Sequence, residues 1–147
     1  MATVNPPTRR HVVLNRRLTL LLSQAVPAEY EVLPEAGWLA APETVFIPDL
    51  MVVRLDAPGE DVIRSAPLLV VEITSRSTRS DDVGRELSAY AEGGAGWYWI
   101  VDPDDRTLAV HQLVPGRFAQ VARYLGDEVA AIEQPIRVPV DLAALFQ

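Results

Sequence analysis

The sequence predicts a single α/β domain in which a mixed β-sheet is flanked by helices. The predicted elements follow in the order helix, strands, helix, strands and a short final helix. Two apolar runs, within 49–55 and 67–74, are rich in β-branched residues, which is typical of strands covered on both faces. Segments with apolar residues at helical spacing can supply that cover. A chain of 147 residues is long enough to form one domain with its own core.

The first helix is predicted over about residues 9–25, after a loose arm at residues 1–7. Thr8 is a suitable N-cap. The apolar residues that share one face of this helix are Leu14, Leu18, Leu21, Leu22 and Ala25. The arginines that lie largely off that face are Arg9, Arg10, Arg16 and Arg17. They form either a solvated basic side or a phosphate-contacting surface, and the sequence leaves both open.

The remaining elements follow from apolar runs and turn residues. Short strands are predicted at about 29–33, 44–47, 49–55 and 67–74. A second helix is predicted from Asp81-Asp82 to about residue 92, where Gly93-Gly94 ends it. Later strands are predicted at about 97–101, 107–113, 117–124 and 136–140, with a final helix at 141–146. No repeat or linker divides the chain, so we expect one domain over residues 1–147.

The composition excludes several kinds of site. Without cysteine, the chain has no disulfide, zinc-thiolate site or thiol nucleophile, and two histidines are too few for a His-rich metal site. The net charge of −7 argues against broad, non-specific nucleic-acid binding, although a local basic groove is compatible with it. All 13 basic residues are arginine. A catalytic role that usually belongs to a lysine must therefore fall to another residue type in this chain.

The apolar runs are too short for a membrane span, which requires roughly 18 residues. Arg16-Arg17 and the leucines after it faintly resemble a signal peptide, but that apolar core is short. We therefore expect an amphipathic helix in a cytoplasmic protein.

Glu72 is the most informative residue of the chain. It interrupts an otherwise buried strand, where an unpaired carboxylate costs several kcal/mol unless a metal or partner satisfies it. Pro48-Asp49 stands at the head of the other apolar run. Two acidic residues on neighbouring strands can hold one hard cation between them. Glu72 also lies near the C-terminal end of its strand, where ligands usually bind in α/β sheets.

Other roles are open for these carboxylates and for their neighbours. Asp49 can cap a turn at the start of its strand, and Glu72 can pair with an arginine such as Arg54. The hydroxyl residues of the next loop lack a nucleophile-elbow motif, so loop and capping roles are favoured over a catalytic serine. Trp97, Tyr98 and Trp99 alternate along a strand, which favours core packing over a base-stacking platform.

Several motifs together carry a family resemblance. They are Pro48-Asp49, the run from Leu69 to Thr78, Asp82 followed by Tyr90-Ala91, and the run from Gly96 to Pro103. In this order and spacing they closely resemble the bacterial Uma-type restriction endonucleases, whose fold is that of the PD-(D/E)XK nuclease superfamily. The resemblance covers nearly the whole chain, including a closing segment at 138–142. It implies a restriction-endonuclease-like core.

The resemblance also implies roles for individual residues. Asp49 and Glu72 correspond to the metal-binding carboxylates, with the main-chain carbonyl of Ile73 as a third ligand. A glutamate near the first strand often completes such sites; Glu29, Glu31 and Glu35 are open, and we take Glu31 as the candidate. The implied cofactor is Mg²⁺ or Mn²⁺, which would activate a bound water and neutralise charge on the scissile phosphate.

The chain departs from the family pattern at the catalytic lysine. The classical motif has its lysine two residues after the glutamate, and Thr74 occupies that position after Glu72. Uma-type proteins carry a substitute lysine on the helix, and Glu86 occupies that position here. Arg76 and Arg85 are the candidates to stabilise charge on the phosphate instead. A guanidinium is a poor proton acceptor because its pKa lies above about 12.

The sequence thus predicts a divalent-metal-dependent DNA endonuclease that forms a homodimer. The alternative is a nuclease-fold module that has lost catalysis and binds a protein or nucleic acid. The missing lysine, Glu86 and the net charge of −7 favour that alternative. A self-associating structural protein is the third class.

Overall fold

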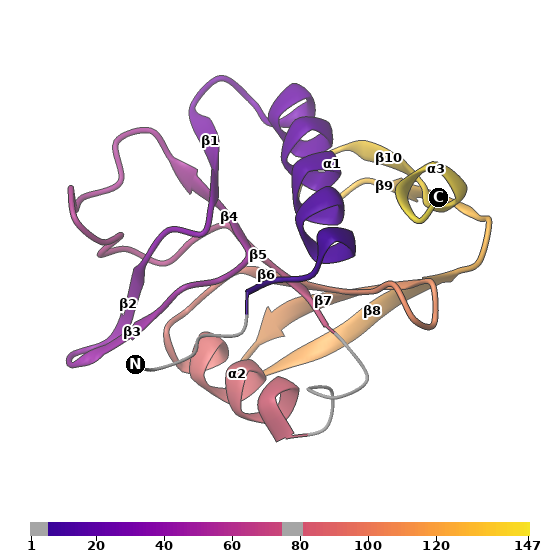
Figure 1. Cartoon of the computed structure of the whole chain (residues 1–147). Helices are drawn as coiled ribbons and strands as arrows, with labels where there is room; N and C mark the ends of the chain where they lie inside the picture. Colours follow the sequence, from indigo (N-terminus) through magenta and orange to yellow (C-terminus); the bar gives the residue numbers. More distant parts are fainter. Residues whose placement is uncertain (1–5, 75–80) are drawn as a thin grey trace.

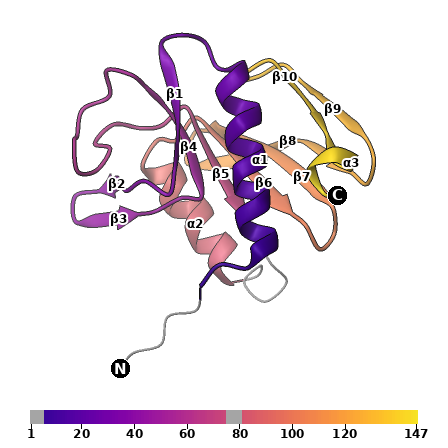
Figure 2. The ribbon, with the colours of Figure 1, turned by 45° about the horizontal axis from the view of Figure 1, so that its top comes forward.

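The computed structural model describes residues 6–74 and 81–147, with the backbone alone for residues 81–85. Its centre is a six-stranded sheet in the order β1-β4-β5-β6-β7-β8, with α1 over one face and α2 over the other (Figures 1 and 2). Strands β5 and β6 run parallel, and their other neighbours in the sheet pair antiparallel. The mixed α/β sheet predicted from the sequence is confirmed.

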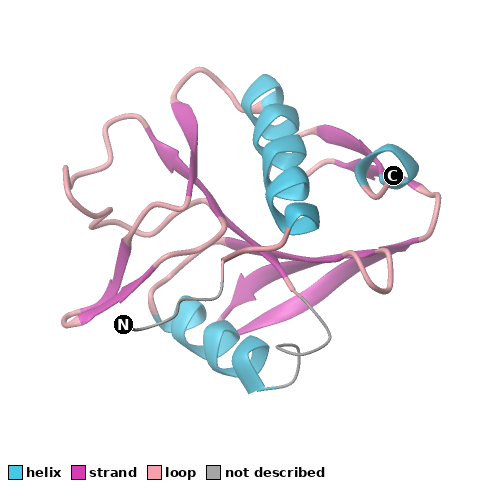
Figure 3. Cartoon of the chain, in the orientation of Figure 1, coloured by secondary structure: helices cyan, strands magenta, loops and turns pink. Residues whose placement is uncertain are grey.

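The elements are distributed along the whole described chain (Figure 3). The helices are α1 (Arg9–Ala25), α2 (Asp81–Glu92) and α3 (Leu142–Leu145). The strands of the six-stranded sheet are β1 (Tyr30–Pro34), β4 (Leu50–Arg54), β5 (Leu69–Ile73), β6 (Trp97–Asp102), β7 (Thr107–Val114) and β8 (Arg117–Leu125). Two small hairpins pair β2 (Trp38–Ala41) with β3 (Thr44–Phe46), and β9 (Val129–Ile132) with β10 (Val138–Asp141).

Helix α1 has the predicted bounds and cap. The Thr8 hydroxyl accepts a hydrogen bond from the His11 main-chain N–H at 3.1 Å, which satisfies one free donor of the first turn. The side chains buried against the sheet are Leu14, Leu18 and Leu22, and they join the larger of the two core clusters. Because these leucines fix the rotation of the helix, they also decide which polar residues of α1 face the sheet.

The central strands are buried on both faces, as predicted. Along β4, Leu50 and Val52 pack beneath α1, whereas Met51 and Val53 pack in the second cluster on the α2 side. Successive strand residues point to opposite faces, so each strand contributes to both clusters. On β6, Trp99 lies in the α1 cluster and Tyr98 in the α2 cluster, which confirms the predicted alternation.

Strands β2 and β9 were not predicted from the sequence. Both are four residues long and contain two alanines, which are depleted in strands. Their pairing comes from neighbours in space: β2 pairs with β3, and β9 pairs with β10. The last predicted strand also begins two residues later than expected, at Val138.

Helix α2 is held by aromatic packing. The ring of Tyr90 lies 5.4 Å from that of Trp38, 5.2 Å from that of Phe46 and 5.5 Å from that of Tyr98, measured between centroids. These distances are typical of favourable aromatic pairs. The packing fixes the position of α2 over the end of β5. Within the described residues, no helix is both long and apolar enough to cross a membrane.

Candidate functional site

Asp49 and Glu72 meet at one end of the central sheet. Strands β4 and β5 pair antiparallel, with Met51 opposite Val70 and Leu50 opposite Val71. One further step in this register places Asp49 opposite Glu72. Alternation along the strands directs both side chains to the face covered by α2, the face that Met51 and Val70 share. The two carboxylates predicted to act together are therefore neighbours.

Asp49 is fixed by contacts from three elements. Its Oδ2 accepts a hydrogen bond from the Ile73 main-chain N–H at 2.7 Å, and its Oδ1 lies 3.1 Å from Nε2 of His11. Its main-chain carbonyl accepts from Nδ2 of Asn15 and from the Glu35 N–H, each at 3.1 Å. Helix α1, the residue after β1 and strand β5 together orient this carboxylate. The carboxylate in turn raises the pKa of His11, mainly through their hydrogen bond.

Glu72 lies in an environment that disfavours the ionised form of its carboxyl group. Its Oε1 accepts a hydrogen bond from the Tyr90 hydroxyl at 2.8 Å. Protein surrounds most of the carboxyl group, and this burial raises the pKa of Glu72 well above its ordinary value. Repulsion from Asp49 and from Glu86 raises this pKa further, and the Tyr90 bond opposes the shift. Glu72 therefore holds its proton more tightly here than it would in water.

Around the two carboxylates lie the positions at which the family resemblance places a lysine. Thr74 is buried, and its hydroxyl oxygen has no hydrogen-bond partner in the described structure. The carboxylate of Glu86 faces the Tyr98 hydroxyl at a long 3.5 Å. Burial, followed by the charge of Glu72, raises the pKa of both Tyr90 and Tyr98, so both phenols stay protonated. They can donate hydrogen bonds but supply no positive charge.

The N-terminal glutamates occupy different positions. Glu31 pairs with Val53, four residues along β4 from Asp49, a distance of about 13 Å at the usual strand rise. The N–H of Glu35 instead bonds to the Asp49 carbonyl, and its charge contributes to the raised pKa of His11. Of the three glutamates left open by the sequence, the structure brings Glu35 close to Asp49 and leaves Glu31, our candidate, apart.

The arginines named from the sequence differ in whether the structure describes their side chains. Arg54 is exposed and bonds to Asp56 at 3.0 Å, so the alternative pairing of Glu72 with Arg54 is not what the structure shows. Arg76 and the side chain of Arg85 lie outside the described residues.

The donor set of Asp49 and Glu72 suits a hard divalent cation. Both groups offer carboxylate oxygens, which Mg²⁺ and Mn²⁺ prefer. Repulsion from Asp49 contributes to the raised pKa of Glu72, and a shared cation would relieve it. No group of three or more histidine, aspartate and glutamate side chains within residues 6–74 and 86–147 is arranged to hold a metal. Water or substrate oxygens would have to complete the coordination.

His11 and Tyr90 are the site residues that sequence reasoning missed. The sequence predicts the helix in which each of them lies, the first helix for His11 and the second for Tyr90. Their contacts with Asp49 and Glu72 depend on how each helix docks on the sheet, which no local pattern shows. The one available signal was their type, because each can hydrogen-bond to a carboxylate.

Three comparisons with known proteins bear on this arrangement. The sequence model of a family described as "Uma2: Putative restriction endonuclease" matches residues 2–143. A crystal structure described as a putative nuclease belonging to DUF820, from Anabaena variabilis ATCC 29413, has a similar fold with a TM-score of 0.76. That match has 15% sequence identity and covers 99% of this chain and 84% of the other. Among curated proteins no sequence matches.

Proposed function

The chain belongs to the Uma2 family of restriction-endonuclease-like proteins, and on that premise we propose that it is a divalent-metal-dependent endonuclease that hydrolyses phosphodiester bonds of DNA. The observation that carries the proposal is the proximity of the two carboxylates: Oδ2 of Asp49 accepts a hydrogen bond from the N–H of Ile73, the residue after Glu72, and the charge of Asp49 contributes to the raised pKa of Glu72. The nuclease-like fold of the Anabaena protein supports it. The repulsion between Asp49 and Glu72, which adds to the effect of burial in raising the pKa of Glu72, supports it too, because a shared cation would relieve that repulsion.

In this proposal Asp49 and Glu72 hold the Mg²⁺ or Mn²⁺ ion. When bound, such an ion lowers the pKa of a coordinated water and neutralises charge on the phosphate. The residues around the pair orient it: His11 and the Ile73 N–H hold Asp49, and Tyr90 holds Glu72. Such outer contacts fix the direction of ligand oxygens. Arg76 and Arg85 remain the proposed groups that stabilise charge on the phosphate.

A second candidate is a nuclease-fold module that binds nucleic acid or protein without cleaving it. The observation that favours it is the charge around Glu72. Both positions at which the resemblance implies a lysine lack one: Thr74 is neutral, and Glu86 adds a negative charge that raises the pKa of Glu72. An approaching phosphate would meet this repulsion unless a cation or the arginines offset it.

Nicking of supercoiled plasmid in Mn²⁺ distinguishes the two candidates. We expect nicking by the wild type and its loss in Glu72→Gln, which keeps the size of the side chain and an acceptor for Tyr90. The control is Glu43→Gln, an exposed glutamate for which nicking should be unchanged. Equal nicking by the wild type and Glu72→Gln would refute the assigned site. No nicking by the wild type, together with retained DNA binding, would establish the binding module.

A further inference from the structure

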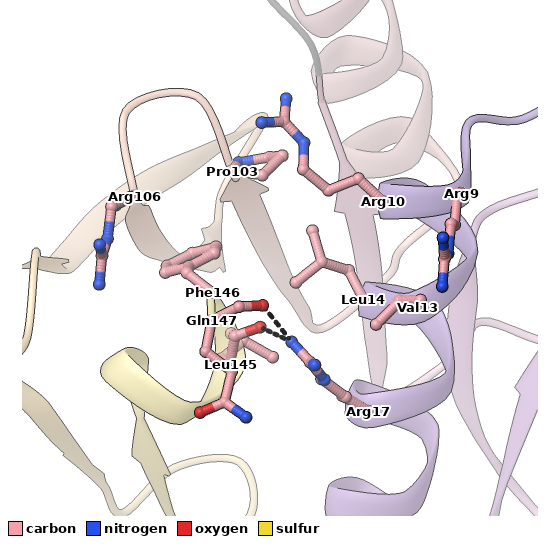
Figure 4. A pocket seen from close by; sticks show the side chains of 10 residues that line it. All are labelled: Arg9, Arg10, Val13, Leu14, Arg17, Pro103, Arg106, Leu145, Phe146 and Gln147. Carbon is pink, nitrogen blue, oxygen red and sulfur yellow. Dashed lines mark hydrogen bonds between the residues drawn. The ribbon is translucent and has the colours of Figure 1, made fainter.

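A cavity apart from the carboxylate pair lies between α1, α3 and the turn that follows β6 (Figure 4). Its volume is about 500 Å³. Four of its ten lining residues are arginines: Arg9, Arg10, Arg17 and Arg106. None of the ten is acidic, although the chain carries 20 acidic residues. We call it the arginine cavity. Its lining is far more basic than the chain as a whole.

The arginines are only partly compensated by their neighbours. Arg10 pairs with Asp104, and Arg106 pairs with Asp127 at 2.8 Å. Arg17 donates from one terminal nitrogen to the main-chain oxygens of Leu145 and Gln147, at 2.9 and 3.0 Å (Figure 4). These two bonds hold the guanidinium in place and do not use its other N–H donors.

Arg9 adds a further charge at the rim. It is exposed, and the described residues give it no ion pair or hydrogen bond. The guanidinium charge of Arg9 is thus left without a carboxylate partner among the described residues, and Arg17 adds N–H donors that its bonds to Leu145 and Gln147 do not use. A guanidinium presents its donors in a planar fork that matches phosphate oxygens. The cavity is therefore suited to an anion with several oxygens.

The remaining walls of the arginine cavity are largely apolar. They include Val13, Leu14, Leu145 and Phe146, with Pro103 opposite the helix. The ring of Phe146 and the face of Pro103 offer flat surfaces, on which a nucleobase can stack. Cavities of roughly 300–1,000 Å³ are typical of sites for small molecules and cofactors. Apolar walls beside arginines fit a nucleotide unit better than a free inorganic anion.

The arginine cavity lies at the same end of the sheet as the carboxylate pair. On α1, Arg10 and Leu14 line the cavity, whereas the next residue after each, His11 and Asn15, bonds to Asp49. Strands β5 and β6 run parallel with Ile73 opposite Val101, so Pro103, which follows β6, lies near the end of β5, one residue beyond Glu72. One nucleic-acid strand could pass over this end of the sheet and contact both places.

We propose that the arginine cavity binds a phosphate-bearing nucleotide of the DNA strand, at a position away from the scissile bond. This inference rests on the proposed function for its substrate and extends it by a binding site. Arg9 and Arg17 contact the phosphate, and Phe146 packs against the base. The cavity adds positive charge at a place apart from the carboxylate pair.

Binding without cleavage tests the proposal. The probe is a fluorescein-labelled single-stranded oligonucleotide, whose anisotropy is followed with the full chain in EDTA. The test variant is Arg9→Glu, because Arg9 is exposed and an acidic residue in the first turn of a helix is favourable. The control is Arg117→Glu, which makes the same charge change at an exposed site near the β7–β8 turn. Circular dichroism verifies that both variants are folded.

We expect Arg9→Glu to weaken binding by about tenfold and to lower the salt dependence by about one phosphate contact, with Arg117→Glu close to wild type. Phe146→Ala should weaken binding with an unchanged salt dependence. Equal weakening by Arg9→Glu and Arg117→Glu would overturn the proposal, because it would show only a general charge effect. Absence of binding by the wild type would overturn it as well.

The failure of this site and the failure of the proposed function give different results. Arg9-dependent binding without nicking in Mn²⁺ would support the arginine cavity and contradict the endonuclease. Nicking that depends on Glu72, with binding that does not depend on Arg9, would support the endonuclease and contradict the cavity. Displacement of the oligonucleotide by millimolar inorganic phosphate alone would show a simple anion site and overturn the nucleotide assignment.

Discussion

The hydroxyl of Tyr90 donates a 2.8 Å hydrogen bond to Oε1 of Glu72 and so ties α2 to the end of β5. Tyr90 is 1% exposed and packs among Trp38, Phe46 and Tyr98. The same side chain therefore holds the helix on the sheet and orients one carboxylate of the candidate site. This dual role makes the site sensitive to the packing of α2.

Tyr90→Phe should destabilise the fold and raise the pKa of Glu72 further, because the lost bond stabilises the ionised carboxylate. We expect a loss of about 1–2 kcal/mol in the free energy of unfolding, from urea denaturation at pH 8. The control is Tyr98→Phe, since the Tyr98 hydroxyl has only a 3.5 Å contact with Glu86. Equal losses in the two variants would contradict a special role for the Tyr90 bond.

Glu72→Gln should stabilise the metal-free protein at neutral and higher pH. The pKa of Glu72 is about 4.5 in the unfolded chain and well above that when folded. Folding therefore favours the protonated form, and this contribution is lost as pH rises through the folded pKa. We expect a stability gain of about 0.5–2 kcal/mol at pH 8 that shrinks toward pH 4.5.

Thermal unfolding in EDTA across this pH range measures the effect of Glu72→Gln. The control is Glu43→Gln, at an exposed site, for which no pH-dependent gain is expected. A gain of the same size at every pH would show that removal of the charge is not the cause.

Glu86→Lys should lower the pKa of Glu72, because it replaces a repulsive charge with an attractive one. It also places a lysine where the family resemblance implies one. We expect Mn²⁺-dependent nicking to rise by at least about tenfold, within the usual range for a positioned acid or base. Ser88→Lys, an exposed site on the same helix, is the control. An equal rise in Ser88→Lys would indicate a general gain in DNA affinity.

The two histidines should affect acid stability in opposite directions. Burial lowers the pKa of His111, so the unfolded chain binds the proton more readily and His111 destabilises the fold as pH falls through about 6.5. Asp49 raises the pKa of His11, so His11 stabilises the fold below about 6.5 and loses this effect as pH rises through its folded pKa.

Urea denaturation of the metal-free protein between pH 8 and pH 5 tests this opposition. His111→Gln should reduce the loss of stability on acidification, and His11→Gln should increase it. The comparison uses the change with pH within each variant, which removes any constant cost of the substitution. The same direction of change in both variants would contradict the assigned environments.

Gly93→Ala should destabilise the junction between α2 and the β2–β3 hairpin. A Cβ at this position would lie 2.7 Å from Cζ2 of Trp38 and 3.0 Å from the Ala40 carbonyl oxygen. We expect a cost of about 1–3 kcal/mol, measured by urea denaturation. The cost should fall in a Trp38→Phe background, where Cζ2 is absent. An unchanged cost there would point to the backbone of residue 93 as the cause.

Local patterns in the sequence determined most of the elements. The bounds of α1 followed from Thr8 and the spacing of its leucines, and the burial of β4 and β5 followed from their runs of apolar residues, which Glu72 interrupts in β5. These signals are strong because each reports burial within one element. Strands β2 and β9 escaped prediction since short, alanine-containing segments become strands only through pairing with a neighbour.

Some residues of the candidate site could likewise be found from the sequence, whereas others could be found only from the structure. The sequence selected Asp49 and Glu72, because a carboxylate within or beside a buried strand is conspicuous. It left Glu29, Glu31 and Glu35 open and named Glu31 as the candidate, since a firm choice depends on the register of β1 against β4. It also left the arginines of α1 as either a solvated side or a phosphate surface, because the apposition of α3 and the turn after β6 is not encoded in any one segment.

The sequence by itself thus determined the family and the fold class and singled out the two carboxylates of the candidate site, because these depend on residues close together in the chain or on their order along it. The tertiary structure decided which groups surround them: His11 on Asp49, Tyr90 and Glu86 around Glu72, and four arginines about one cavity. The physical reason is that charge, burial and hydrogen bonding depend on distances in space, which are fixed only when the helices dock on the sheet.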